Sequence, residues 1–223
     1  MDQHDPFRHH PALRALITPP ESSFFRSFDL DALDAMLAER GLPTGWQRPR
    51  AEIARRRAEA LSGHAGDLWV FGYGSLIWDP GFRFTELRRA RLPGYRRHFC
   101  LVDVLGGRGT AEAPGIIAAL DTVADGRAGC EGLVFRIAER EIATETPPLF
   151  ERELIAPAYI PTFATAETDH GPVRALAFVA DHEADMIRAD IAREDQVRYT
   201  ATGAGFLGTS LDYVANLAAH FEE

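Results

Sequence analysis

The residues best suited to acid–base chemistry lie between positions 149 and 155. Glu153 follows Leu149 by four residues and Phe150 by three, so on a helix these side chains share an apolar side. A carboxylate held among apolar groups has a raised proton affinity and suits a general base working near neutral pH. Two alternatives stay open on pattern alone. Glu151 also falls between apolar residues on the helical wheel, and Glu153 could be an edge carboxylate paired with an arginine.

A second candidate is the glycine turn that follows the apolar run 68–71. Gly72 and Gly74 flank Tyr73, which indicates either dihedral angles that bulkier residues avoid or a close approach of backbone and ligand. Successive N–H groups in such a turn can bind an anion, with Ser75 as a further donor. An ordinary strand-ending turn explains the same pattern. The turn has neither the Gly-Lys-Ser/Thr of a phosphate-binding loop nor a Gly-x-Ser-x-Gly elbow, so we interpret Ser75 as a binding residue, not a nucleophile.

Composition and the remaining motifs argue against several other functions. The eight histidines are scattered, without His-x-x-x-His or a Cys-rich cluster, so we expect no metal. A net charge of −9 opposes binding to nucleic acid or to an anionic membrane surface, which favours a small-molecule partner. Cys100 and Cys130 are far apart and resemble free thiols of a reducing compartment. With neither a membrane-length apolar stretch nor a signal sequence, the predicted location is the cytoplasm.

The elements that must position these residues begin after a distinct N-terminal part. A chain of 223 residues with 46% apolar content can bury one substantial core, so we expect one main domain. Residues 1–66 read as a mainly helical extension, with one helix capped by Asp29 and a second between Pro49 and Gly63. The arginines of the second helix suggest a solvated face more than an anionic partner.

Short apolar runs separated by glycine-containing loops predict strands, at 68–71, 98–104, 115–120, 132–137, 159–165 and 173–180. Their connections are too short for the crossover helices of a parallel sheet, so a mostly antiparallel arrangement is expected. Helices are predicted over 138–156, with an interruption at Pro147 and Pro148, over 183–200, and from Thr209 or Ser210 to Phe221. The arginine-rich stretch 82–97 shows only a turn at Pro93.

Four stretches carry a resemblance to a known family. Residues 70–78 (VFGYGSLIW) look like the signature loop of the ChaC-like γ-glutamylcyclotransferases. Arg152-Glu153-Leu154 with the downstream Tyr159 is similar to the segment that holds the catalytic glutamate of this family. Residues 108–115 and 205–213 match two further motifs. The order of the four is that of the family, and Glu151 has no counterpart.

The match covers about residues 67–221, so the extension 1–66 inherits nothing from it. Departures also occur. Ala111 replaces the usual proline, Thr209-Ser210 replaces Ser-Asn, and Pro157-Ala158 stands where animal members have glycines, which could shift substrate preference.

The resemblance implies an α+β fold, a small mixed or antiparallel and partly closed β-barrel with flanking helices, formed by a catalytic domain at 67–223. It also implies an intramolecular reaction in which the amino group of a γ-glutamyl unit attacks its own γ-carbonyl and releases 5-oxoproline. With glutathione as substrate, the other product is Cys-Gly.

Site residues follow from the same resemblance. Glu153 would be the base, the loop from Gly72 through Tyr73, Gly74 and Ser75 to Leu76 would hold the γ-glutamyl group, and Arg108 would meet a substrate carboxylate. Tyr159 either bonds the substrate or packs. No cofactor is required. Two alternatives remain: a cyclotransferase for other γ-glutamyl amines, and a non-catalytic module that binds a γ-glutamyl metabolite. The oligomeric state is left undetermined by the sequence.

Overall fold

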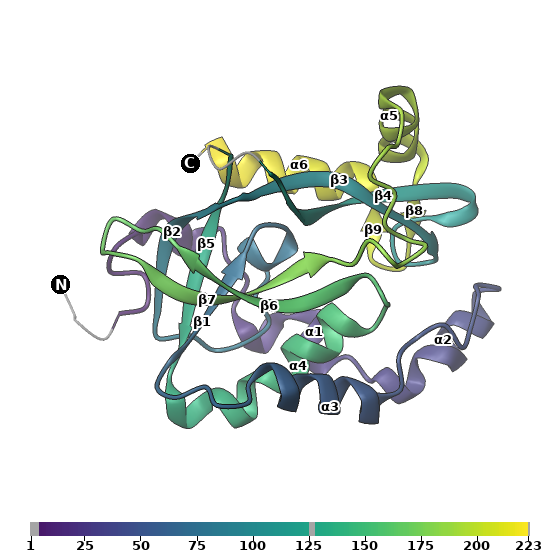
Figure 1. Cartoon of the computed structure of the whole chain (residues 1–223). Helices are drawn as coiled ribbons and strands as arrows, with labels where there is room; N and C mark the ends of the chain where they lie inside the picture. The colour runs from purple at the N-terminus through teal and green to yellow at the C-terminus, as the bar shows by residue number, and fades with distance from the viewer. Residues whose placement is uncertain (1–4, 125–127, 223) are drawn as a thin grey trace.

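A curved sheet forms the centre of the molecule (Figure 1). The computed structural model describes residues 5–124 and 128–222, and within them the sheet has seven strands in the order β2-β5-β1-β7-β4-β3, with β6 on the other edge of β7. The strands are β1 (Leu68–Gly72), β2 (Glu86–Pro93), β3 (Tyr95–Leu105), β4 (Thr110–Thr122), β5 (Gly129–Ile137), β6 (Tyr159–Ala166) and β7 (Val173–Ala180). A separate two-stranded ladder joins β8 (Ala204–Gly205) and β9 (Gly208–Thr209).

The pairing of the strands is mixed and mainly antiparallel, which confirms the predicted α+β class. β1 with β5, β2 with β5, β3 with β4, and β6 with β7 are antiparallel, whereas β7 runs parallel to β1 and β4. The sheet is not a closed barrel. β2 and β6 approach each other without forming a continuous ladder. A single β-bridge joins Arg91 of β2 to Glu167, the residue that follows β6.

Six helices flank the sheet in the described residues: α1 (Phe24–Ser27), α2 (Leu33–Glu39), α3 (Arg50–Ala60), α4 (Ile142–Leu154), α5 (Arg193–Thr202) and α6 (Ser210–Glu222). In Figure 1, α1 to α4 lie below the sheet, and α6 runs along its upper side beside β3. The helices of the extension, α1 to α3, therefore lie on the same side of the sheet as α4. Among the described residues, no helix is long and apolar enough to cross a membrane.

Three elements differ from the sequence-based prediction. β2 was missed, because its arginines hide the alternation of buried residues. Pro147 and Pro148 were expected to interrupt a helix, yet α4 runs through both. The helix predicted over 183–200 was only partly right, since the chain before Arg193 instead pairs Ile187 with Leu101 of β3.

The extension shares the main hydrophobic core with the rest of the chain. Leu33 and Leu37 of α2 and Ile53 of α3 are at most 1% exposed and belong to the same cluster as Phe150 of α4. Full burial of each such side chain stabilises the fold by about 1.5–3 kcal/mol. Residues 1–4 lie outside the described residues.

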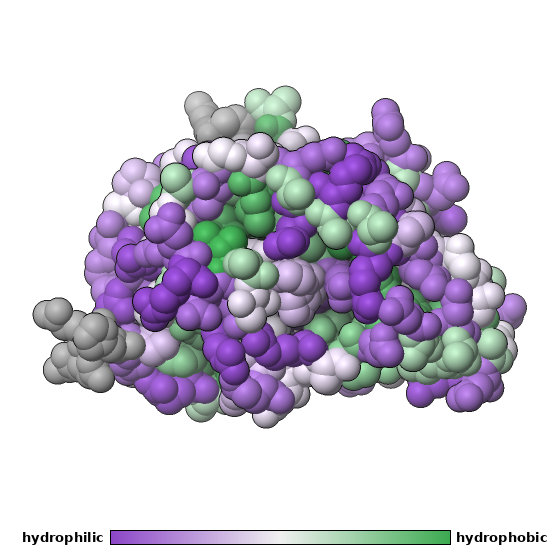
Figure 2. Space-filling model, turned by 90° about the horizontal axis from the view of Figure 1, so that it is seen from below, coloured by the Kyte–Doolittle hydropathy of each residue, from purple (hydrophilic) through white to green (hydrophobic). Residues whose placement is uncertain are grey.

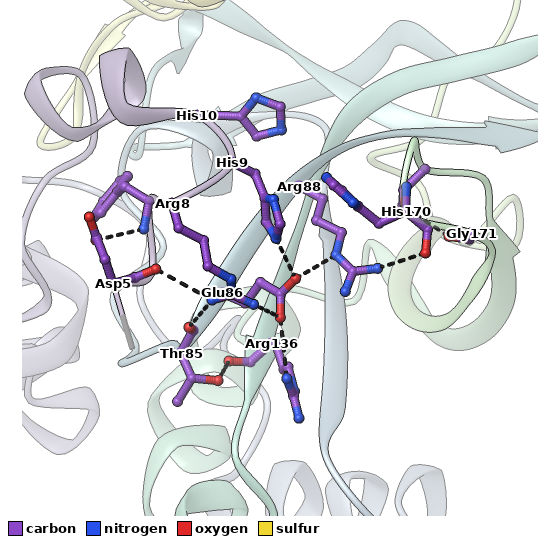
Figure 3. A network of polar contacts seen from close by, with 12 residues as sticks. Asp5, Arg8, His9, His10, Thr85, Glu86, Arg88, Arg136, His170 and Gly171 are labelled. Atoms are coloured by element: carbon purple, nitrogen blue, oxygen red, sulfur yellow. Dashed lines mark hydrogen bonds and ion pairs between the residues drawn. The ribbon is translucent and has the colours of Figure 1, made fainter. Parts of the chain in front are cut away.

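Buried ion pairs also fix the extension to the sheet. Figure 3 shows Glu86 of β2 between Arg8 and His9 of the extension and Arg88 and Arg136 of the sheet. Burial by itself would raise the pKa of Glu86, but the hydrogen bonds and charges of Arg88 and Arg8 lower it to about 2. The carboxylate, 1% exposed, is thus charged and well paired.

The arginines of α3 form local pairs along the helix. Arg56 bonds Glu52 at 2.9 Å, and Arg55 pairs with Glu59, each at a separation of four residues. Seen from below, this side of the molecule is largely hydrophilic, with smaller hydrophobic areas between (Figure 2). Such pairs are typical of a solvated helix face.

Candidate active site

The glycine turn after β1 leads into a short 3₁₀ turn, Ser75–Ile77. The φ angle of Gly74 is −124°, so left-handed backbone is not the reason for this glycine. The reason is proximity: a Cβ atom on Gly74 would lie 2.8 Å from the Tyr213 hydroxyl, and one on Gly72 would lie 3.1 Å from the Leu76 Cβ. The loop is thus pressed against α6 and against its own next turn.

Glu153 projects from the last turn of α4 toward this loop. Its side chain is 12% exposed, and burial raises its pKa, while the neighbouring charge of Arg152 opposes the rise. The Arg152 Nε atom lies 3.2 Å from Glu153 Oε1. Glu151, the competing carboxylate, is 28% exposed and pairs with Arg50 of the extension at 3.1 Å. Glu153 lines both hollows described below, and Glu151 lines neither of them.

Arg152 joins three parts of the site. Its guanidinium donates to Ser75 Oγ at 2.8 Å and to the carbonyl of Asp79, so it fixes the loop to α4. Phe25 of the extension lies over the same guanidinium, 4.0 Å from ring centroid to Cζ. A cation sandwiched in this way is held by its carboxylate, by hydrogen bonds and by the aromatic ring.

Three tyrosines line the same recess as Glu153. The Tyr73 hydroxyl donates to the carbonyl of Phe178 at 3.0 Å. Burial raises the pKa of Tyr73 and of Tyr159 well above the ordinary value of 10, and it raises the pKa of Tyr213 to about 12. All three phenols therefore stay protonated at neutral pH. Tyr159 and Tyr213 border the space in front of Glu153.

Arg108 lines the same cavity as Glu153. Its guanidinium donates to the carbonyl of Thr209 at 3.1 Å and lies over the ring of Tyr213 at 5.2 Å. Burial lowers its pKa, although Tyr213 and Asp103 raise it. An arginine has five N–H donors, and this contact uses one of them.

Two connected hollows meet at Glu153. The larger has a volume of about 160 Å³ and reaches from Arg108 and Arg152 to the aromatic residues of the extension. The smaller, about 30 Å³, is a recess between the loop and α6. Both are lined by Ser75, Ile117, Glu153, Tyr159 and Tyr213. A recess of this size holds one or two water-sized groups, such as the oxygens of a carboxylate or a carbonyl.

The structure thus gathers most of the residues singled out in the sequence. Tyr73, Gly74 and Leu76 line the smaller recess, Arg108 lines the larger hollow, and Ser75, Glu153 and Tyr159 line both; Gly72 lines neither and supports the turn.

The lining residues that were not predicted as site residues include Arg152, Tyr213, Asp103 and Phe25. The first two stood inside quoted motifs, which was the signal available for them. Asp103 is 5% exposed; burial raises its pKa, although it accepts backbone N–H groups of the loop that carries Arg108. Nothing in its sequence environment marks it. Phe25 lies in the extension, where the only signal is the density of aromatic residues near it.

Comparison with known proteins places this geometry in a family. The family model described as ChaC-like protein matches residues 68–223. The chain belongs to the ChaC-like family. A glutathione-specific gamma-glutamylcyclotransferase of Escherichia coli (strain K12) is 36% identical over 153 residues, which are 68% of this chain and 64% of that protein. The glutathione-specific gamma-glutamylcyclotransferase 1 of Mus musculus is 30% identical over 155 residues, or 68% of either chain. The match thus spans about two thirds of these relatives, slightly less for the bacterial one.

Among solved structures, a gamma-glutamyl cyclotransferase specific to glutathione from yeast superimposes with a TM-score of 0.66. The superposition covers 71% of this ChaC-like chain and 88% of the yeast chain at 18% identity. At that identity, the likeness supports the fold.

Proposed function

We propose that this ChaC-like protein is a γ-glutamylcyclotransferase that cleaves glutathione to 5-oxoproline and Cys-Gly. The observation that carries the proposal is the position of Glu153: a nearly buried carboxylate with a raised pKa, at the junction of two hollows and opposite the Gly72–Leu76 loop. Relatives named for this activity in a bacterium and a mouse support the choice of substrate.

In the proposed reaction, the α-amino group of the γ-glutamyl unit forms a bond to its own γ-carbonyl carbon, and the amide bond to the cysteine breaks. An ammonium group cannot attack, so Glu153 accepts its proton and then returns a proton to the departing amine. Because its pKa is raised toward neutrality, the carboxylate can both accept the first proton and donate the second. Holding the chain in a curved, near-attack shape makes the step unimolecular, and no cofactor is needed.

The loop and the neighbouring donors hold the reacting group in this proposal. The recess beside Tyr73, Gly74, Ser75 and Leu76 takes substrate oxygens, where N–H groups stabilise the charge that develops on the carbonyl. Tyr159 adds a protonated hydroxyl, and Arg108 attracts a substrate carboxylate in the larger hollow. Arg152 positions both Ser75 and Glu153.

The division of the chain belongs to the same proposal. Residues 67–223 are the catalytic unit, as the family match over 68–223 supports, and residues 1–66 are an extension whose described part, 5–66, packs on it. The cytoplasm is the proposed compartment, because two free, buried cysteines fit reducing conditions.

The test is the release of 5-oxoproline from glutathione by the purified chain. Glu153→Gln keeps the shape of the side chain but cannot accept a proton, so we expect kcat to fall by about 10²–10⁴-fold. Glu151→Gln is the matched control on the same helix and should keep wild-type activity, because Glu151 pairs with Arg50 outside the hollows. Undiminished turnover by Glu153→Gln would overturn the proposed role.

A panel of γ-glutamyl amines separates this proposal from its two alternatives. Faster turnover of another γ-glutamyl amine would replace glutathione as the substrate. Tight binding of glutathione with no product from any member of the panel would indicate a non-catalytic binding module.

A further inference from the structure

The larger hollow has an aromatic wall that comes from the extension, outside the part of the chain that matches the family. Phe24 and Phe25 belong to α1, Phe28 follows it, and Trp46 lies between α2 and α3. We call these four residues the aromatic wall. Phe206 and Leu207 add further apolar surface to the same hollow, whose charged lining residues are Asp103, Arg108, Arg152 and Glu153.

Polar contacts hold the aromatic wall against α4. Arg26, between two wall residues, donates to both carboxylate oxygens of Glu145, which is fully buried in α4. Arg48, two residues after Trp46, is 8% exposed and donates from its side chain to the carbonyl of Leu154 at 2.9 Å. The indole N–H of Trp46 donates to the carbonyl of Pro43 at 3.0 Å. The wall is therefore a fixed surface with defined partners.

The position of the aromatic wall relative to Glu153 determines which part of a substrate contacts the wall. Glu153 lies where the hollows join, and the recess on the loop side has room only for small oxygen groups. In the proposed reaction the scissile amide lies beside Glu153, so the departing amine extends into the larger hollow. That part of the substrate faces the aromatic residues of the extension.

We propose that the aromatic wall selects the departing amine, so that the extension completes the active site and favours γ-glutamyl amines with an apolar side chain next to the scissile amide. The inference rests on the proposed cyclotransferase function. An apolar side chain is stabilised when it leaves water and contacts aromatic rings. The CH₂SH side chain of cysteine is a small member of this class.

The experiment compares two substrates that differ at this position only: γ-glutamyl-leucine and γ-glutamyl-glycine. Release of 5-oxoproline gives kcat/KM for each, and their ratio measures selection. The wild-type ratio should favour leucine by about 10-fold or more, as expected for several methylene groups in an apolar pocket. Phe28→Ala and Trp46→Ala should each lower the ratio by about 10-fold, mainly through KM for the leucine substrate.

Phe7→Ala is the matched control, because Phe7 is an aromatic residue of the same extension that packs on Phe84 at 5.5 Å and lies outside the hollow. It should keep the wild-type ratio. Phe28→Leu and Trp46→Phe retain most of the packing and should give intermediate ratios, which keeps the test decisive where an alanine variant does not fold.

A ratio that stays at the wild-type value in the wall variants of an active enzyme would overturn the role of the wall and leave the proposed reaction intact. A wild-type preference for the glycine substrate, or turnover of glutathione with no 5-oxoproline from either of the two substrates, would do the same. Absence of 5-oxoproline from the wild type with both of these substrates and with glutathione would overturn the reaction itself, and the inference with it.

Discussion

Glu153 makes the stability of the folded protein fall as the pH rises, whereas a carboxylate with a lowered pKa has the opposite effect. Burial raises its pKa above the ordinary 4.5, so the folded state binds the proton more tightly than the unfolded state does. The stability from this group is fully present below about 4.5 and is lost as the pH rises through the raised pKa. The burial of the Glu153 carboxylate therefore opposes folding at neutral pH.

Glu153→Gln should accordingly be more stable than the wild type at neutral pH. Glutamine has no charge to bury, and the difference should shrink as the pH falls below 4.5, where Glu153 is protonated in both states. Urea unfolding of both proteins on either side of this pH gives the answer. Lower stability of the variant at neutral pH would mean that the ion pair with Arg152 outweighs the cost of burial.

Residues of the candidate site were predictable where the residue type and its local spacing marked the position. The helical spacing of Glu153 and the glycines of the loop could be read directly from the chain. Arg152 and Phe25 could not, because their roles depend on contacts between distant positions: Arg152 bonds the carbonyl of Asp79 and lies against the ring of Phe25. Asp103 could not either, because its burial and its place in the hollow arise only when the sheet folds. Spacing along one element carries no information about such pairs.

Ser210 is the joint at which three elements meet. Its side chain is fully buried, accepts the N–H of Ile116 in β4 at 2.9 Å and donates to the carbonyl of Arg108 at 3.3 Å, from the first residue of α6. A Cβ on Gly115 would lie 2.2 Å from that same carbonyl oxygen, so the joint has no spare room. Ser210 thus fixes the loop that carries Arg108.

Ser210→Ala should lower the free energy of unfolding by about 1–3 kcal/mol, because a buried N–H group loses its acceptor. Denaturant unfolding measures the loss. Ser62→Ala, at an exposed turn after α3, should change stability by less than about 0.5 kcal/mol. Equal small effects of both variants would show that the joint is dispensable.

Helices and strands whose apolar residues follow one clear periodicity were predictable from the sequence, and elements without such a pattern were not. The apolar runs gave β3 to β7 to within a few residues, except that β4 extends well before its predicted start. β2 escaped because its arginines are covered by partners: Arg88 lies over the ring of Trp69 at 4.6 Å and bonds Glu86. α4 accommodates Pro147 and Pro148 one to two turns from its start, where tertiary packing of Phe150 and Leu149 favours the helix over local propensity.

Attachment of the extension depends on a few buried charges in addition to its apolar residues. Glu145 is fully buried and draws its main side-chain partner, Arg26, from the extension. Burial alone would raise the pKa of Glu145, but Arg26 and the N–H of Arg83 lower it. Docking of residues 5–66 and the ionisation of Glu145 are therefore coupled.

Arg26→Ala should destabilise the protein by about 3 kcal/mol or more, because it leaves the buried carboxylate without its main counter-charge. Thermal or denaturant unfolding gives the value. The matched control is Arg14→Ala, whose pair with Asp5 is largely exposed, and we expect less than about 1 kcal/mol there. A small effect at Arg26 would indicate that the extension is held by its apolar residues alone.

The two cysteines of the chain lie inside the sheet, Cys100 in β3 and Cys130 in β5, each at most 2% exposed. Burial raises their pKa values to about 12 and about 11. Exchange between thiols and disulfides requires an accessible thiolate. A protein proposed to act on a thiol peptide is thereby protected from disulfide exchange with it. When the cellular pool of that peptide becomes oxidised, neither cysteine offers an accessible thiolate to a mixed disulfide. The proposed turnover would then depend on the supply of substrate and not on the oxidation state of the protein's own cysteines.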